Sequence, residues 1–429
     1  MLDQQATFAQ IGDLLERRRP GHSLPGAFYN DPAIFDFDLR EIFGRSWLMV
    51  GFEVEVAAPG SYLALTIGRS PIVVWHGMDG VLRGFFNSCR HRGAQILPDG
   101  CGTAERMMCP YHQWMYDDHG ALRGAGRMPR DFDKSEHGLK PIHVRTVAGT
   151  LYVCLADDAP DFTAFHDKVA PMLAPHDMLN AKVAAQATLV ERGNWKLVME
   201  NARECYHCSA RHPELSVSFP TDARGNFLSS ERVNIQNFQE RMEALGLPSA
   251  PVEGAWWQAS RFALREGNAS ITLDGQPCVR KPMCAINGGD VGSMRWALEP
   301  HSFCHALGDF TFMFIALPVA PEETIVLAKW LVHKDAVEGV DYTVDDLVNV
   351  WNETNLQDRD LVETNQRGVN SLGYQPGPYS EISESLAIRF VDWYAAQVKA
   401  QLAAQIAAQL ASPIPHAVVT GQRPILAAE

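Results

Sequence analysis

Cys89-Arg90-His91 and Cys109-Pro110-Tyr111-His112 decide the fold of the first half of this protein. Each stretch carries one cysteine and one histidine, two residues apart in the first and three apart in the second. Together they supply two thiolates and two imidazoles, which are ligands for soft and intermediate metals. Such short spacings place each pair of ligands on one loop. We therefore expect two loops that hold a metal centre between them.

The order of the ligands favours an iron–sulfur cluster over zinc. In a Rieske [2Fe–2S] centre, two cysteines bind one iron and two histidines bind the other. Zinc also accepts two cysteines and two histidines, but zinc fingers place both cysteines before both histidines. Each loop here carries one of each. We interpret Cys89, His91, Cys109 and His112 as ligands of a Rieske [2Fe–2S] cluster, and the chain as one that handles electrons.

The size and charge of the chain limit its class. A length of 429 residues with 46% hydrophobic residues favours two domains with sizeable cores. A formal net charge of −14 argues against binding to nucleic acid or to anionic membranes. Arg17-Arg18-Arg19 could suggest an export signal, but Pro, Gly, Asn and Asp interrupt the following residues 20–31. We expect a cytoplasmic protein without a membrane span.

Changes in sequence texture divide the chain into three segments. Residues 1–44 are expected to form a helical leader and linker, and residues 45–157 a small antiparallel β domain with the two metal loops. Residues 158–429 are expected to form the catalytic domain, on which the leader packs. In this part we expect helices over Leu189–Arg211, Asp345–Arg367 and Ser383–Leu410, and strands over Asp309–Val319 and Thr324–His333.

The segment Glu204–His212 carries a second group of metal-binding side chains. Glu204 and His207 are three residues apart and would share one face of a helix. Pro213 disfavours helical backbone at His212, so the chain is expected to turn there and can bring this imidazole back. Two histidines completed by one carboxylate form the facial triad of non-haem ferrous sites, which leaves positions open for dioxygen and substrate.

The carboxylate of this triad is expected from the helix over Asp345–Arg367. Asp358 falls on the apolar, inward stripe of this helix together with Trp351, whereas Asp360 and Glu363 fall on the solvated side. A buried acid needs a charge or a metal as its partner. We therefore predict Asp358 as the third ligand; a surface ion pair is the alternative.

Cys205 and Cys208 leave zinc open as an alternative occupant of this second site. They are one helical turn apart and could chelate a metal together with the histidines. Four such ligands would form a closed structural site, whereas a Rieske centre needs an electron acceptor. We favour iron and interpret both cysteines as residues that pack around its ligands.

These motifs together resemble the oxygenase component of the Rieske non-haem iron oxygenases. The resemblance covers about residues 25–395 and rests on the two Cys/His loops, Glu204-x2-His207-x4-His212 and Gln357-Asp358. Three segments are similar to the quaternary-ammonium branch of that family: Asn201–Cys208, Trp330–Tyr342 and Gly377–Ser380. The resemblance implies an α+β fold with an N-terminal antiparallel β Rieske domain. It also implies a catalytic domain whose antiparallel sheet wraps around a long helix, in a helix-grip, START-like arrangement.

The family resemblance also implies a head-to-tail homotrimer. The cluster of one subunit would then lie close to the iron of its neighbour, and a carboxylate at the place of Glu204 would bridge a histidine ligand on each side. Aromatic-ring dioxygenases usually have Asp at this place, so Glu204 agrees better with the quaternary-ammonium branch. Electrons are expected from a separate flavin and ferredoxin-type reductase, because the chain has no nucleotide-binding fingerprint.

The resemblance implies oxidative N-demethylation of a quaternary ammonium compound with O2. Glycine betaine, giving dimethylglycine and formaldehyde, is the expected substrate; stachydrine (proline betaine), carnitine-like compounds and choline are alternatives. An aromatic-ring-hydroxylating dioxygenase α subunit is a further alternative. A pure electron-transfer Rieske protein would need only residues 46–157 and would leave the second metal site unexplained.

A quaternary ammonium has no N–H to donate and is usually held by aromatic faces. Trp256, Trp257 and Phe303 are candidates for such contacts, with ordinary core or lid packing as the alternative for each. A substrate carboxylate would need a donor, and the candidates are His301, His305 and Arg295. Their spacing does not distinguish among these three.

Overall fold

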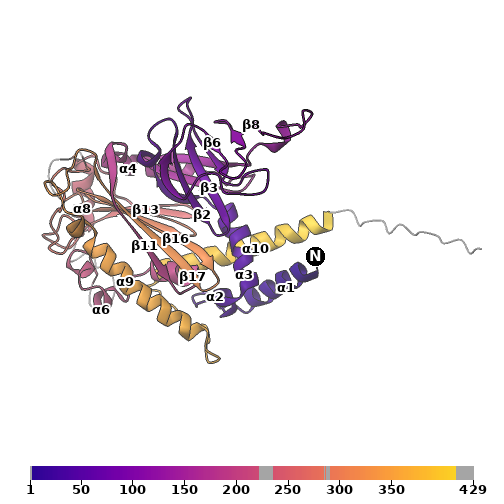
Figure 1. Cartoon of the computed structure of the whole chain (residues 1–429). Coiled ribbons are helices and arrows are strands. Elements are labelled where there is room, and N and C mark those ends of the chain that lie inside the picture. Colours follow the sequence, from indigo (N-terminus) through magenta and orange to yellow (C-terminus); the bar gives the residue numbers. More distant parts are fainter. Residues whose placement is uncertain (1, 222–234, 285, 287–289, 412–429) are drawn as a thin grey trace, which may run out of the picture.

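The computed structural model describes residues 2–221, 235–284, 286 and 290–411 (Figure 1). Met1 and the end of the third predicted segment, residues 412–429, therefore lie outside it. Within the described residues, the strands form two seven-stranded sheets and one sheet of three strands. The first sheet and the small sheet belong to the metal-loop domain, and the second large sheet belongs to the catalytic domain (Figure 1).

The first sheet is antiparallel and has the strand order β1-β10-β9-β4-β3-β2-β5. Its short apolar strands alternate with tight turns, as expected from the sequence over this region. The strands are β1 (Leu48–Phe52), β2 (Ser61–Ile67), β3 (Ser70–His76), β4 (Leu82–Phe86), β5 (Gly100–Thr103), β9 (Pro141–Val147) and β10 (Thr150–Cys154).

The three-stranded sheet carries one of the metal loops. Its strands are β6 (Met107–Met108), β7 (Met115–Tyr116) and β8 (Leu122–Gly124), all paired antiparallel. The loop from Cys109 to Trp114 connects β6 to β7, and the loop that begins with Cys89 follows β4. The two Cys/His motifs therefore project from two neighbouring antiparallel sheets.

The catalytic sheet is also antiparallel throughout, in the order β11-β17-β16-β15-β14-β13-β12. The predicted strands at Asp309–Val319 and Thr324–His333 correspond to its two longest central strands, β16 and β17. The strands are β11 (Ala181–Glu191), β12 (Val252–Glu253), β13 (Trp257–Phe262), β14 (Ser293–Leu298), β15 (Ser302–Ala306), β16 (Thr311–Ala320) and β17 (Glu323–His333).

Both faces of this sheet are buried, which explains why β16 is apolar along most of its length. On one face, Phe312 stacks on Trp351 of the long helix with ring centroids 4.3 Å apart and an interplanar angle of 5°. On the other face, Cys304 contacts Met49 of β1 in the first domain, sulfur to sulfur at 3.3 Å. The catalytic sheet thus lies between the long helix and the metal-loop domain.

The long helix is α9 (Val344–Val369), and it agrees with the predicted helix over Asp345–Arg367. Thr343 caps its N-terminus by accepting a hydrogen bond from the Asp346 amide at 3.2 Å. Asp345 and Asp346 in the first turn favour the positive end of the helix dipole. The predicted α+β fold, with an antiparallel sheet packed on a long helix, is confirmed.

The predicted continuous helix over Leu189–Arg211 is wrong. Leu189 to Glu191 end strand β11, and a helix begins only at Trp195 because Asn194 caps it through the Lys196 amide at 3.0 Å. The other described helices include α1 (Leu2–Glu16), α2 (Ala27–Asn30), α3 (Pro32–Phe37), α4 (Thr163–Leu173), α5 (Trp195–Asn201), α6 (Cys208–Arg211), α8 (Ile235–Ala244) and α10 (Ser385–Ala411).

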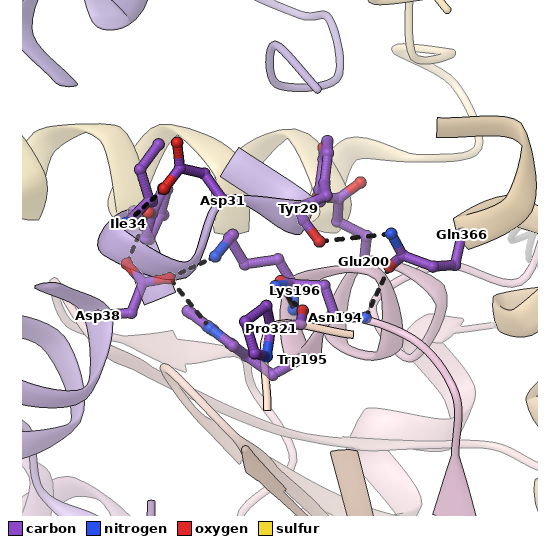
Figure 2. Close-up of polar contacts among 11 residues, drawn as sticks. Tyr29, Asp31, Ile34, Asp38, Asn194, Trp195, Lys196, Glu200, Pro321 and Gln366 are labelled. Atoms are coloured by element: carbon purple, nitrogen blue, oxygen red, sulfur yellow. Dashed lines mark hydrogen bonds and ion pairs between the residues drawn. The ribbon is translucent and has the colours of Figure 1, made fainter. Parts of the chain in front are cut away.

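A buried polar network attaches the N-terminal leader to the catalytic domain (Figure 2). Asp38, just after α3, forms an ion pair with Lys196 of α5, and both side chains are fully buried. Asp38 also accepts hydrogen bonds from Tyr394 of α10 at 2.7 Å and from the Trp195 indole at 3.2 Å. Since its partners come from α5 and α10, Asp38 ties the leader to two helices of the catalytic domain.

Among the described residues, every helix is too short or too polar to cross a lipid bilayer.

Candidate metal centres and active site

The two Cys/His loops have closely similar backbone turns. The Gly93 amide donates to the Cys89 carbonyl at 2.9 Å, and the Gln113 amide donates to the Cys109 carbonyl at 3.0 Å. Gly93 (φ 79°) and Gln113 (φ 58°) both have left-handed backbone, which closes each turn. The cysteines are buried at the base of the loops, whereas His112 lies at an exposed tip.

The side chains of these loops meet histidine to histidine and cysteine to cysteine. The Nδ1 atoms of His91 and His112 lie 3.2 Å apart, and Trp114 stacks on the His91 ring at 4.8 Å. Burial raises the pKa of the Cys89 thiol, whose sulfur lies 3.3 Å from the Tyr116 hydroxyl. One pair of facing imidazole nitrogens and one pair of buried cysteines fit a cluster with one His-ligated and one Cys-ligated iron.

The second group of metal-binding atoms lies at the two ends of α6 and on α9. Nε2 of His207 is 3.2 Å from Oδ1 of Asp358, and Nε2 of His212 is 3.0 Å from the same oxygen. His212 ends α6 with non-helical backbone just before Pro213, which returns its ring toward His207. Two ligands about 2.1 Å from one metal at a right angle are about 3.0 Å apart, so the spacing suits a facial triad.

The far nitrogens of both imidazoles are held by hydrogen bonds. Nδ1 of His207 donates to Oε1 of Glu204 at 2.5 Å, and Nδ1 of His212 donates to Oε1 of Gln357 at 2.7 Å. The Gln357 amide nitrogen donates to Glu214 at 3.1 Å, which orients its oxygen toward His212. These bonds place the proton on Nδ1 of each ring and leave Nε2 with a free lone pair.

Two atoms at the centre of this group have the environment expected of metal ligands. Nε2 of His212 and Oδ1 of Asp358 are both buried, and neither has a well-aligned hydrogen bond within the described part of the chain. Burial raises the pKa of Asp358, but hydrogen bonds and charge from the two imidazoles outweigh it and lower the pKa to about 2. Since buried polar atoms are normally satisfied, a cation between the imidazoles and this carboxylate fits the site.

Cys205 and Cys208 form a disulfide with each other. The sulfur of Cys208 lies within 4.8 Å of ligand atoms of His207 and His212. A sulfur that is bonded to another sulfur is not a thiolate and is therefore a poor metal ligand. The alternative of a zinc site with both cysteines and both histidines thus disagrees with the structure. The sequence interpretation of these cysteines did not anticipate their bond.

A cavity of 420 Å³ adjoins His207, His212 and Asp358. Its opposite side is formed by the catalytic sheet, where Phe303 and His305 point inward because they alternate with Cys304 along β15. Trp351 of α9 covers the same space, at 5.0 Å from the His305 ring. The volume is in the range usual for small-molecule sites.

The structure separates the six residues that were candidates for substrate contacts. Phe303, His305 and Arg295 line the cavity. Trp256 and Trp257 do not; both pack on Phe165 of α4. His301 is also absent from the lining and is buried against Phe43. Trp256, Trp257 and His301 are therefore no longer candidates for substrate contacts, because their rings pack between elements outside the cavity.

Comparisons with known proteins match both halves of the chain. Residues 46–150 match the model of the Rieske [2Fe-2S] domain, and residues 178–400 match that of the ring hydroxylating alpha subunit (catalytic domain). The chain is 44% identical to a glycine betaine monooxygenase oxygenase subunit of Pseudomonas aeruginosa, covering 90% of this chain and 91% of that protein. It is also 44% identical to one from Chromohalobacter salexigens, covering 89% and 87%.

Solved structures show the same fold. The quaternary ammonium Rieske monooxygenase CntA in complex with L-carnitine superimposes with a TM-score of 0.68 at 23% identity, over 90% of this chain and 98% of that one. A naphthalene 1,2-dioxygenase from Rhodococcus superimposes with a TM-score of 0.63 at 17% identity, over 93% and 98%. At these identities the structural likeness concerns the fold alone.

The chain belongs to the Rieske non-haem iron oxygenases, as an oxygenase component with a Rieske domain and a ring-hydroxylating catalytic domain. Its identity to proteins of nearly full length places it in the quaternary-ammonium branch of that family. The two matched domains are those that hold a [2Fe–2S] cluster and a mononuclear non-haem iron. The predictions of the family and of both cofactors are therefore confirmed, and the catalytic domain excludes a pure electron-transfer protein.

Proposed function

We propose that this protein is the oxygenase subunit of a monooxygenase that N-demethylates glycine betaine. The balanced reaction consumes glycine betaine, O2, two electrons and two protons, and yields dimethylglycine, formaldehyde and water. The observation that carries this proposal is the 44% identity to glycine betaine monooxygenase oxygenase subunits over nine tenths of the chain. An aromatic-lined cavity beside the His207, His212 and Asp358 cluster supports it.

In this proposal, each cofactor is held by the residues described above. Cys89, Cys109, His91 and His112 would hold the cluster, and His207, His212 and Asp358 would hold ferrous iron. When bound, the cluster would supply electrons one at a time, and the iron would supply the oxidation of a substrate C–H bond with O2. Hydroxylation of an N-methyl group gives a carbinol that releases formaldehyde and the tertiary amine.

Glu204 is the residue to which we assign electron transfer between the two centres. One carboxylate oxygen of Glu204 accepts a hydrogen bond from Nδ1 of His207, at a distance of 2.5 Å. The other oxygen accepts a hydrogen bond from the Tyr206 amide. Tyr206 is 54% exposed beside it, and Tyr111 is 56% exposed beside His112 on the other domain. Two exposed aromatic residues next to the two centres suit a head-to-tail homotrimer in which His112 of one subunit faces Glu204 of the next.

The electrons must come from a partner, and we propose a separate flavin and ferredoxin-type reductase. The chain is similar over nearly its full length to proteins named as oxygenase subunits, a name that implies further components. The net charge of −14 permits steering of a partner with a positive docking face. We further propose that the protein acts in the cytoplasm.

The test is product formation by purified, reduced protein given glycine betaine, stachydrine, carnitine and choline in parallel. We expect formaldehyde and dimethylglycine with glycine betaine, matched by O2 uptake. Formaldehyde release with another of the four compounds, and not with glycine betaine, would identify that compound as the substrate. No turnover of any of them, by protein with both metal centres full, would contradict N-demethylation and favour an aromatic ring as substrate.

A further inference from the structure

Arg295 is a partly buried cation that lines the cavity from the middle of the catalytic sheet. It lies on β14 opposite Ser260 of β13 and opposite His305 of β15, so the three residues form one row across the sheet. All three line the cavity, and the Arg295 guanidinium lies 6.0 Å from the centre of the Phe303 ring. A positive charge is thus placed directly beside the aromatic part of the cavity.

This guanidinium has no counter-charge of its own. Within the described residues, Arg295 has neither an ion-pair partner nor a hydrogen-bond partner. The nearby acid Glu299 is already bonded to Arg203, at 2.6 Å and 3.2 Å to two guanidinium nitrogens. Burial, followed by repulsion from Arg203, lowers the pKa of Arg295 to about 9. A charge that is partly removed from water and has no partner is costly, so an anion that enters the cavity would be stabilised beside Arg295.

Unsatisfied polar atoms lie in the lining of the same cavity. Nε2 of Gln258 and the hydroxyl of Ser249 are buried without hydrogen-bond partners among the described residues, and Ser249 is only 2% exposed. Gln258 and Ser260 are two residues apart on β13 and therefore share the cavity face with Arg295. A carboxylate has several lone pairs and could accept hydrogen bonds from more than one of these groups.

The other candidates for a carboxylate partner are weaker. His301 lies outside the cavity lining. His305 lines the cavity, but its Nδ1 is bonded to the Ser293 hydroxyl at 2.8 Å. Burial and the charge of Arg295 lower the pKa of His305 well below its ordinary value, so this imidazole is neutral. Arg295 alone of the three brings a full positive charge and parallel N–H donors to the cavity.

We propose that Arg295 binds the carboxylate of the substrate, with Phe303, His305 and Trp351 contacting its methylated nitrogen. This inference rests on the proposed function and adds the reason for its substrate class. One methylene separates carboxylate and ammonium in glycine betaine, which suits a guanidinium placed next to an aromatic face. Arg295 therefore selects zwitterionic betaines over choline, which has a hydroxyl in place of the carboxylate and would be repelled by the guanidinium.

The experiment compares equilibrium dissociation constants of glycine betaine and choline by calorimetry, without O2, on the protein with both metal centres loaded. For Arg295→Met we expect glycine betaine to bind about 10- to 150-fold more weakly, the range for a hydrogen bond to a charged group. Choline binding should stay within about threefold or tighten. Arg295→Lys keeps the charge but not the two parallel donors and should fall between wild type and Arg295→Met.

Arg389→Met is the matched control, because Arg389 already has a counter-charge in Glu253. It should leave both dissociation constants unchanged. Equal weakening of both ligands in Arg295→Met, or unchanged binding of glycine betaine, would overturn the inference. If Arg295→Met does not fold, a binding constant for glycine betaine in Arg295→Lys equal to that of wild type would overturn it as well.

The outcome is separable from that of the proposed function. Wild type that demethylates glycine betaine while Arg295→Met binds it normally would refute only the role of Arg295. Wild type that demethylates choline in preference to every betaine would refute both the carboxylate site and the expected substrate.

Discussion

Gln357→Leu tests whether the second metal site depends on the residue that orients its histidine. Gln357 accepts the Nδ1 proton of His212 at 2.7 Å, and its own amide nitrogen is held by Glu214 at 3.1 Å. Leucine has similar bulk but cannot accept this proton. The imidazole would then lose both its fixed orientation and its preference for a free Nε2 lone pair. All three proposed ligands remain in this variant, so any change reports on orientation.

The expected loss is 10- to 100-fold in affinity for the metal, the usual effect of removing a hydrogen bond to a histidine ligand. This corresponds to about 1.4 to 2.7 kcal/mol. We place it toward the upper part of the range because His212 is only 1% exposed, so water cannot easily replace the lost acceptor. Glu214→Ala, which removes only the outer partner, should cost less than Gln357→Leu.

The assay is anaerobic titration of protein freed of the second metal with Fe²⁺ or Co²⁺, with the absorbance of the Rieske cluster as an internal measure of folded protein. Asp360→Asn is the control on the same helix, because Asp360 is 60% exposed and paired with Arg359. It should bind metal as wild type does. Unchanged affinity in Gln357→Leu, or an equal loss in Asp360→Asn, would refute the reasoning.

Four further predictions concern single groups. Asp358→Ala should lose iron and retain the cluster, measured by metal analysis and visible absorbance; an active, iron-loaded variant would exclude Asp358 as a ligand. Glu204→Gln should retain both metal centres but slow electron transfer between them in single-turnover kinetics. Loss of the mononuclear iron from this variant would show instead that Glu204 is an iron ligand. Cys208→Ser should retain iron because the bonded sulfur is not expected to be a ligand, and loss comparable to that of Asp358→Ala would contradict this. Lys196→Met leaves Asp38 buried without its counter-charge, so the free energy of unfolding in urea should fall by about 3–5 kcal/mol. The double variant with Asp38→Asn should recover most of this loss. An equal loss in the single and the double variant would show that packing is responsible.

Chemistry that depends on residue type and short spacing could be predicted from the sequence. The two Cys/His pairs indicated a Rieske cluster because its two irons need different ligands, and the domain match agrees. Helical periodicity put Asp358 on the inward stripe of its helix, and the structure brings it next to both histidines. These inferences concern turns and helices, whose geometry is set within a few residues.

Contacts between distant segments needed the tertiary structure. Trp256 and Trp257 have the residue type expected for a cation site, but strand register and helix α4 turn them away from the cavity. Gln357 was part of a recognised motif, yet only the approach of α9 to His212 gives its amide a role. The helix expected over Leu189–Arg211 failed because β11 pairs with β17, a partner far along the chain.

The sequence by itself determined the family and predicted the types of ligands and the domain organisation, because residue chemistry and local spacing carry that information. The tertiary structure decided which side chains face the cavity and which partly buried charge has no partner. Arg295 shows the difference: its sequence neighbours do not distinguish it from His301 or His305. Its unpaired charge follows from the pairing of β13, β14 and β15 and from Glu299 being bonded to Arg203. Such pairing depends on strands distant in sequence, so only the folded chain defines it.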